Sequence, residues 1–194
     1  MMLVRLLLLL LPFSLFSQSD NSFILGMGSC LDQDNDQQEI WASLKKEDLT
    51  EFFFLGDNIY GDNKDGSLEK MLSAYKKQSN NLPNWLNEIE INAIWDDHDF
   101  GVNDGGEDYK EKAQAQKLFL DFWKIQEADR RSNGEGIYFS KDVLLNNKII
   151  KIIGLDTRYF RSPLEGEKRK LTPTKDTNKT ILGVDQWSWL ENQL

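Results

Sequence analysis

Short, largely apolar runs recur along the chain and predict the strands of a sheet. They cover residues 23–28, 52–55, 90–95 and 148–155. In the second run every position is apolar, as expected for a strand that is covered on both faces. Strands of this kind belong to parallel sheets flanked by helices, so the pattern predicts an α/β fold.

Between these runs, apolar residues recur three and four positions apart, which predicts amphipathic helices. The clearest stripe runs from Ala115 to Ile125, and a shorter one lies near residues 40–44. Another helix is expected after Ser67, whose hydroxyl can cap its N-terminus. Helices therefore alternate with the predicted strands, as they do in βαβ units.

The C-terminal third of the chain has a different pattern. Residues 137–139 and 143–145 are two short apolar runs, which we interpret as the two strands of a hairpin. Residues 165–179 are polar and interrupted by proline, so they predict a surface excursion. A last helix is expected after Asp185, which can cap it, with Trp187 on its apolar side.

A polar cluster follows each predicted strand at its carboxyl end. The clusters are residues 28–30, 56–60, 95–99 and 156–158. Ligands of open α/β sheets bind at this edge, so we expect the four clusters to converge on one site. Carboxylate and phenol oxygens with one thiol and one imidazole suit a trivalent or alkaline-earth cation better than a zinc-only site.

The N-terminus is typical of a secretory signal peptide. Arg5 precedes the leucine run Leu6–Leu11, and the chain turns polar at residues 17–19. The apolar stretch is about half of the ~20 residues that a membrane-spanning helix needs. We therefore expect cleavage after residues 1–18, a folded part at 19–194 without a membrane span, and a secreted or periplasmic protein.

The composition narrows the class of protein further. The chain has 194 residues, 40% of them hydrophobic, which is the size of one domain or part of one. Its 32 acidic and 23 basic residues give a net charge of -9, which argues against a nucleic-acid partner because such binding needs a basic face. The single cysteine, Cys30, cannot form an internal disulfide. It is either a small buried residue or, after a strand end, part of a site.

Five segments resemble, in the same order, the alkaline phosphatase D family, the PhoD-like metallophosphoesterases. Gly56-Asp57-Asn58-Ile59-Tyr60 is similar to the Gly-Asp-x-x-Tyr motif of two-metal phosphoesterases, and Trp95-Asp96-Asp97-His98-Asp99 stands where this family replaces a Gly-Asn-His motif. The other segments are residues 28–30, 155–161 and 186–190. The resemblance implies a metallophosphoesterase-like αββα sandwich, of which this chain holds the first half only.

The resemblance also implies a role for each candidate residue. Cys30 and Tyr60 ligate a ferric ion, Asp57 bridges it to a second ion, and Asp97 ligates that second ion. The second ion is calcium in most of the family, and other divalent metals are alternatives. His98 contacts the phosphate and protonates the leaving oxygen. Two cations ~4 Å apart activate water and stabilise developing charge in phosphate-ester hydrolysis, so we expect a small phosphate monoester or diester as substrate.

The roles of several further residues stay open. Asp96, Asp99 and Asn103 are candidates either for further metal ligands or for partners and caps that orient the ligands. Arg158 is a candidate phosphate-binding residue, and pairing with a nearby acid is its alternative role. Arg161 has the same two alternatives.

The chain departs from the family pattern in one respect. The family's sheet continues into a second half that ends in a Gly-Asp-x-His type segment with further ligands, and residues 1–194 contain no such segment. We therefore expect a truncated N-terminal portion that is inactive alone, with an unpaired apolar sheet edge prone to aggregation. A rival interpretation is a non-catalytic secreted calcium-binding module or an inactive fragment.

Overall fold

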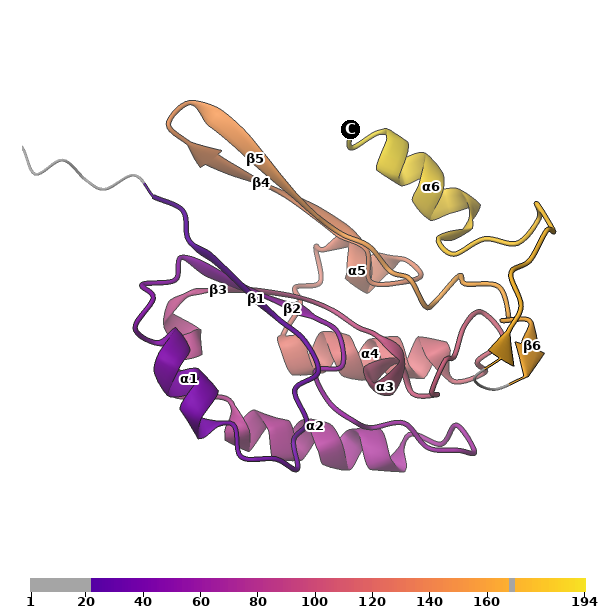
Figure 1. Ribbon diagram of the computed structural model, residues 1–194. Coiled ribbons are helices and arrows are strands. Elements are labelled where there is room, and N and C mark those ends of the chain that lie inside the picture. The colour runs from indigo at the N-terminus through magenta and orange to yellow at the C-terminus, as the bar shows by residue number, and fades with distance from the viewer. Residues whose placement is uncertain (1–21, 168–169) are drawn as a thin grey trace, which may run out of the picture.

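A three-stranded parallel sheet lies at the centre of the molecule. The computed structural model describes residues 22–167 and 170–194. The strands are β1 (Leu25–Gly28), β2 (Glu51–Leu55) and β3 (Glu90–Ile94), hydrogen-bonded in the order β1-β2-β3. The predicted α/β class is confirmed, and all three strands end at the same edge of the sheet (Figure 1).

Three helices cover one face of this sheet (Figure 1). They are α1 (Gln38–Leu44), α2 (Glu69–Asn81) and α4 (Lys112–Trp123). The side chains of Phe52 and Phe54 point to these helices and belong to the main apolar core. Since alternate strand residues face opposite sides, these two positions set the helix-covered face of β2.

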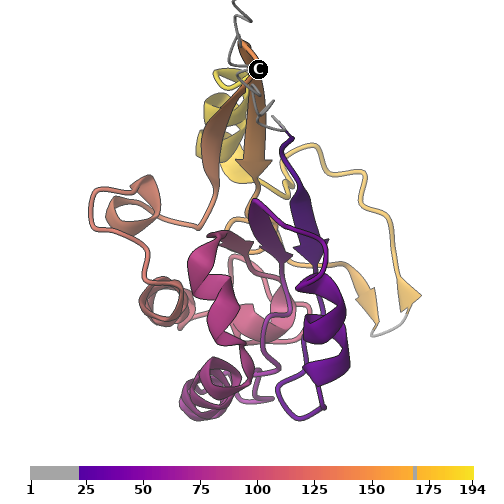
Figure 2. The same ribbon diagram turned by 90° about the vertical axis from the view of Figure 1, so that its left-hand side faces the viewer.

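A two-stranded hairpin covers the other face. It consists of β4 (Phe139–Leu145) and β5 (Lys148–Gly154), and it stands above the sheet in Figure 2. Phe53 packs against Phe139 there, with 5.7 Å between ring centroids. Helix α6 (Gly183–Glu191) lies on the same side of the sheet (Figure 1).

The hairpin corrects two sequence predictions. Residues 137–139 and 143–145 do not pair with each other, because 139–145 is one strand that pairs with β5. The turn lies at Asn146 and Asn147, whose φ angles of 50° and 63° fit the type I′ geometry that asparagine favours in two-residue hairpins. The fourth predicted strand therefore belongs to a separate antiparallel sheet rather than to the central one.

Several short elements connect the main ones. The periodicity did not predict η1 (Asn84–Glu88), α3 (Asp97–Phe100) or α5 (Arg130–Asn133), each of which spans five residues or fewer. The polar stretch at residues 165–179 contains a small hairpin of β6 (Gly166–Glu167) and β7 (Lys170–Leu171). Its described residues are largely exposed, as predicted for a surface excursion.

The predicted caps of two helices are wrong. Helix α2 begins after Leu68, and the hydroxyl of Ser67 instead accepts a hydrogen bond from the Asn63 amide at 2.9 Å. Helix α6 begins at Gly183, so Asp185 lies inside its first turn. Trp187 is 50% exposed, because the face of α6 that turns inward carries Gln186, Trp189 and Leu190 instead.

The N-terminal predictions rest on the sequence alone. The signal peptide expected at residues 1–18 lies outside the described residues. Among the helices of the described part, none has the length and apolar character that crossing a bilayer requires.

Candidate metal centre

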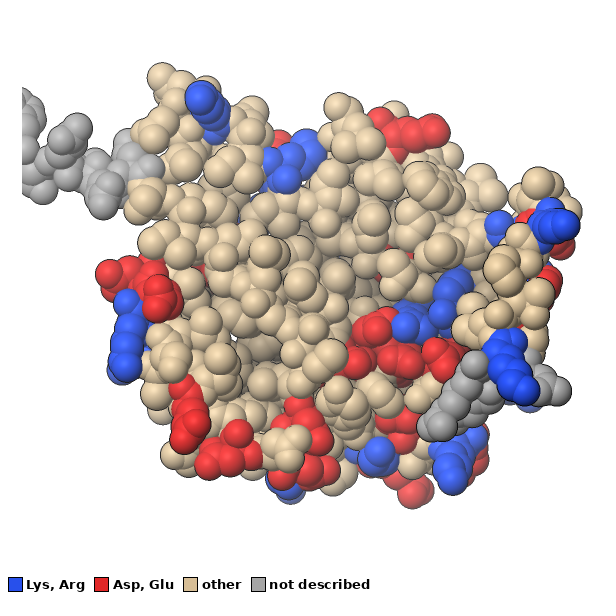
Figure 3. Space-filling model, in the orientation of Figure 1, with Lys and Arg blue, Asp and Glu red and all other residues tan. Residues whose placement is uncertain are grey.

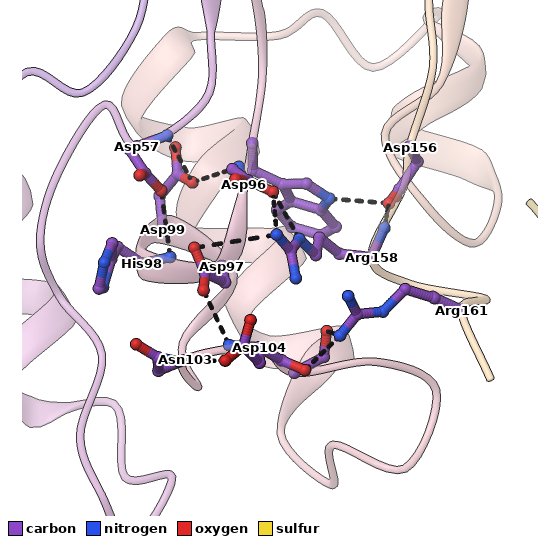
Figure 4. Close-up of polar contacts among 12 residues, drawn as sticks. Asp57, Asp96, Asp97, His98, Asp99, Asn103, Asp104, Asp156, Arg158 and Arg161 are labelled. Carbon is purple, nitrogen blue, oxygen red and sulfur yellow. Dashed lines mark hydrogen bonds and ion pairs between the residues drawn. The ribbon is translucent and has the colours of Figure 1, made fainter. Parts of the chain in front are cut away.

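Asp57, Asp97 and His98 come together at the carboxyl edge of the sheet (Figure 4). One carboxylate oxygen from each aspartate and one ring nitrogen of His98 lie within 4.8 Å of one another. Asp57 follows β2, whereas Asp97 and His98 open the short helix α3 after β3. The expected convergence of the second and third polar clusters is therefore observed.

The loop after β2 is shaped by a glycine. Gly56 has φ 104° and Asp57 has φ 51°. A Cβ atom on Gly56 would lie 2.7 Å from the backbone nitrogen of Asp96, which is closer than real Cβ contacts allow. Gly56 thus lets the loop after β2 pack directly against the loop after β3, and this packing brings Asp57 near Asp97.

Asp99 connects the same two loops through hydrogen bonds to their backbones. Its side chain is fully buried and accepts the backbone N–H groups of Asp57 at 3.2 Å, Asn58 at 3.1 Å and Asp96 at 2.6 Å. The Asn58 amide donates to it at 2.6 Å as well. Burial raises the pKa of Asp99 to about 8, although these donors act in the opposite direction. Of its two open roles, the contacts favour that of a partner that orients the ligands.

Arg158 pairs with a local acid. Its Nε and Nη2 atoms both lie 2.5 Å from Oδ1 of Asp96, and Nη2 lies 3.9 Å from Oδ1 of Asp97. Asp96 in turn is the N-cap of α3, where it forms a capping box with Asp99. Arg161 donates instead to the backbone carbonyl oxygens of Asp104 and Gly105. Both arginines therefore hold the chain around the site together.

Asp156 explains how Arg158 reaches the site from a strand outside the central sheet. Its buried carboxylate accepts the indole N–H of Trp95 at 2.9 Å and the backbone N–H of Arg158 at 2.9 Å. These bonds connect the fourth polar cluster, residues 156–158, to Trp95, which directly precedes Asp96. The fourth cluster therefore lies beside the third one, as expected, although β5 is not part of the parallel sheet.

Asn103, a candidate further ligand, and its neighbour Asp104 lie beside Asp97. Oδ2 of Asp97 accepts the backbone N–H of Asp104 at 2.8 Å. Asn103 is exposed, and its amide donates to the Asp104 carboxylate at 2.7 Å. Asn103 therefore lies beside the centre without belonging to the three-residue group.

Cys30 and Tyr60 border the group on the Asp57 side. Cys30 is exposed, and its Sγ atom lies 3.8 Å from Oδ2 of Asp57. The ring of Tyr60 lies 4.4 Å from that of His98, centroid to centroid. Burial, together with the negative charge that Cys30 and Asp57 carry when ionised, raises the pKa of Tyr60 to about 12. Both residues are thus near the centre, as expected from the resemblance.

Asp62 is a site residue that the sequence patterns did not reveal. Its Oδ1 atom lies 2.6 Å from Nδ1 of His98. The side chains of His98 and Asp62 are 24% and 20% exposed. The available signal was its position, since Asp62 follows Tyr60 by two residues in the loop that carries Asp57.

The electrostatics of the centre are those of a cation site. The pKa of Asp57 is raised, first by burial and then by the charges of Asp97 and Asp96, against lowering contributions from His98. Burial acts to lower the pKa of His98, but Asp62, Asp97 and Asp57 raise it overall. On the face drawn in Figure 3, acidic and basic side chains gather below the hairpin, toward the right. Crowded carboxylates beside an imidazole form a donor set that fits a bound cation.

A cavity of about 770 Å³ adjoins the centre. Its wall includes Asp62, Asn103 and Asp104, and so uses residues that contact His98 and Asp97. Tyr109 lines it as well and donates its hydroxyl to the carbonyl oxygen of Gly66 at 2.9 Å. Asp57, Asp97 and His98 are not among the lining residues, so the cavity lies beside the centre and shares with it only the residues that contact Asp97 and His98.

The fold and the site define an α/β protein with a carboxylate-rich candidate metal centre at the edge of a parallel sheet. A family model described as PhoD-like phosphatase matches residues 25–194, and the chain belongs to that family. The family resemblance of the sequence motifs is therefore confirmed. No curated protein matches the chain.

One solved structure, described as the structure of PhoD, has a similar fold. The TM-score is 0.59 and the sequence identity 20%, and the match covers 87% of this chain and 38% of that chain. At this identity the likeness concerns the fold alone. The chain spans well under half the length of the PhoD structure that it matches, and so corresponds to a partial domain.

Proposed function

We propose that this chain supplies part of the active site of a metal-dependent phosphoric ester hydrolase. The observation that carries the proposal is the group of Asp57, Asp97 and His98, whose ligand atoms lie within 4.8 Å of one another. The group stands at the strand ends where ligands of α/β sheets bind. Membership of a phosphatase family implies a phosphoester substrate.

The residues around the group support two cation positions. Cys30, Tyr60 and Asp57 would hold a ferric ion, and Asp57 and Asp97 a calcium or other divalent ion. Thiolate and phenolate suit the ferric ion, and carboxylates suit calcium. When bound, such ions lower the pKa of a coordinated water and stabilise the charge that develops on the phosphate oxygens.

The chain's own side chains then have distinct tasks. Asp57 and Asp97 supply the negatively charged oxygens that would bind the cations. Asp99 fixes the loop that carries Asp57 by accepting its backbone N–H groups. His98 protonates the leaving oxygen from a ring nitrogen. Arg158 neutralises Asp96 through a hydrogen bond of 2.5 Å from Nε, and its Nη1 atom, which has no partner among the described residues, is the atom we propose for a contact with phosphate.

The substrate we propose is a small phosphate monoester or diester. The adjoining cavity of about 770 Å³ has the size of a small-molecule site. A net charge of -9 disfavours long polyanions such as nucleic acids. We further propose export through the signal peptide at residues 1–18, which places the enzyme outside the cytoplasm. Sequencing the N-terminus of the protein recovered from its native host tests this cleavage.

Metal binding tests the proposal in the chain itself. We expect residues 19–194 to bind Ca²⁺ or Mn²⁺ in a calorimetric titration, and Asp57→Asn to weaken that binding at least tenfold. Asp142→Asn, which removes an acid on the distant hairpin, is the matched control. Addition of Fe³⁺ as its citrate complex should produce a tyrosinate absorption band that Tyr60→Phe abolishes. Calcium binding without this band would favour the calcium-module interpretation.

Hydrolysis is tested in a protein that carries the remainder of the fold. Sequencing the gene beyond the Leu194 codon shows whether such a protein is encoded. In it, we expect turnover of p-nitrophenyl phosphate or bis(p-nitrophenyl) phosphate to require Asp57. Turnover that survives Asp57→Asn, in a variant that unfolds at the same temperature as wild type, would contradict the metal assignment.

A further inference from the structure

The loop that follows β2 holds His98 through three consecutive residues. The ring of Tyr60 lies 4.4 Å from the imidazole, and the N–H of Gly61 donates to the carbonyl oxygen of His98 at 3.2 Å. The carboxylate of Asp62 lies 2.6 Å from Nδ1. The same short loop therefore holds one face and one edge of the imidazole ring, and it also holds the backbone of His98.

The path of this loop depends on Gly61. A Cβ atom there would lie 2.8 Å from the Cα atom of Met71, in the buried first half of α2. The loop thus lies directly on the helix, and its close approach brings Asp62 back toward α3. The contact between Asp62 and His98 follows from how the loop packs, and it joins residues that are 36 positions apart.

We infer that Asp62 is a positioning residue that fixes the tautomer of His98, so that Nδ1 carries the fixed proton and Nε2 is the reactive nitrogen. An ionised carboxylate only accepts hydrogen bonds, so a partner nitrogen at 2.6 Å must carry the hydrogen. A histidine with one nitrogen engaged in this way presents the other to a ligand or substrate. Asp62 also lines the cavity beside the centre. The residue that fixes the proton on Nδ1 therefore lies where substrate would enter.

The assignment defines the proton transfer of the proposed hydrolase, on which it rests. The ring enters this step as the imidazolium, protonated on both nitrogens. The N–H bond at Nε2 breaks, an O–H bond forms on the leaving oxygen, and the electron pair stays on Nε2, which leaves the neutral ring with its proton on Nδ1. The Nδ1–H bond to Asp62 is kept throughout. Without Asp62 the neutral ring would place its proton on either nitrogen, and a fraction of molecules would present the wrong one.

The single histidine makes the inference directly measurable. We would label residues 19–194 with ¹⁵N-histidine and record long-range ¹H–¹⁵N correlations without metal, at about pH 9, where the neutral ring predominates. The wild-type spectrum should show a protonated Nδ1 and an unprotonated Nε2. Asp62→Ala should shift the ring at least partly to the Nε2–H form.

Asp108→Ala is the matched control, because it removes an exposed acid of the same cavity wall. It should leave the wild-type tautomer unchanged. A wild-type ring with its proton on Nε2 would overturn the inference without any variant, and so would an Asp62→Ala spectrum identical to wild type. Neither result depends on metal binding or turnover, so the inference and the proposed function can fail separately.

Discussion

The carboxylate of Asp99 accepts the backbone N–H of Asp57 at 3.2 Å, although the two residues belong to loops after different strands. Asp99 is the third residue of the same four-residue helix that carries Asp97 and His98. A single buried side chain therefore sets the position of one half of the candidate centre relative to the other. Its loss should affect both the stability and the geometry of the site.

Asp99→Asn tests this relationship with little change in shape. Above its raised pKa of about 8, Asp99 is a carboxylate that accepts N–H groups from Asp57, Asn58 and Asp96, and at that pH the amide of the variant presents a donor in its place. We expect the free energy of unfolding to fall by roughly 3 kcal/mol, because buried donors lose their acceptor. Urea unfolding measures this, and Asp121→Asn on the exposed side of α4 should change it by less than about 0.5 kcal/mol. Equal stability of the two variants would show that Asp99 does not organise the loops.

Gly56→Ala tests the packing of the same two loops from the backbone. The residue has φ 104°, and its Cβ would lie 2.7 Å from the backbone nitrogen of Asp96. We expect a loss of at least about 2 kcal/mol in unfolding free energy, and weaker Ca²⁺ or Mn²⁺ binding. The matched control is Gly134→Ala, whose Cβ would meet the flexible end of Arg130 and whose φ is not positive. The prediction fails if the two alanine variants unfold at the same denaturant concentration.

Local patterns predicted the strands that end at the site, because an apolar run followed by polar residues is a feature of the sequence itself. They did not predict the contact of Asp62 with His98, which depends on how a loop packs against α2. They placed the hairpin wrongly, although Asn146-Asn147 is the turn signal that separates its strands. The role of Arg158 stayed open for a different reason. The same side chain suits a phosphate or an acid, and only the folded position of Asp96 shows that Arg158 pairs with that acid.

Asp129 predicts a pH dependence of stability away from the metal centre. Its carboxylate caps α5 by accepting the N–H of Arg131, and it also receives two hydrogen bonds from the Arg131 guanidinium. Partial burial acts to raise the pKa of Asp129, but these bonds and the charge of Arg131 outweigh it and lower the pKa. A lowered folded-state pKa means that the contribution to stability is present above the unfolded pKa and is lost at more acidic pH.

We therefore expect Asp129→Asn to reduce the free energy of unfolding by a constant amount between pH 7 and the usual aspartate range, about pH 4. Below that range the difference from wild type should shrink, because the wild-type carboxylate becomes protonated. Urea unfolding across this pH series measures the difference. A gap between the two proteins that widens on acidification would have the wrong sign for a lowered pKa.

The tip of the β4–β5 hairpin predicts self-association. Leu144 and Ile149 are paired across the strands and are 73% and 67% exposed. Adjacent exposed apolar side chains on a two-stranded sheet favour contact between molecules.

Replacing them together, Leu144→Lys with Ile149→Glu, keeps a favourable cross-strand pair and removes the apolar surface. We expect light scattering to show less association at high concentration, with the thermal unfolding midpoint changed little. The double variant Asp142→Lys with Lys151→Glu, which exchanges the two ends of a cross-strand ion pair without removing apolar area or changing net charge, should associate as wild type does. If both proteins associate equally, the contact surface lies elsewhere on the molecule.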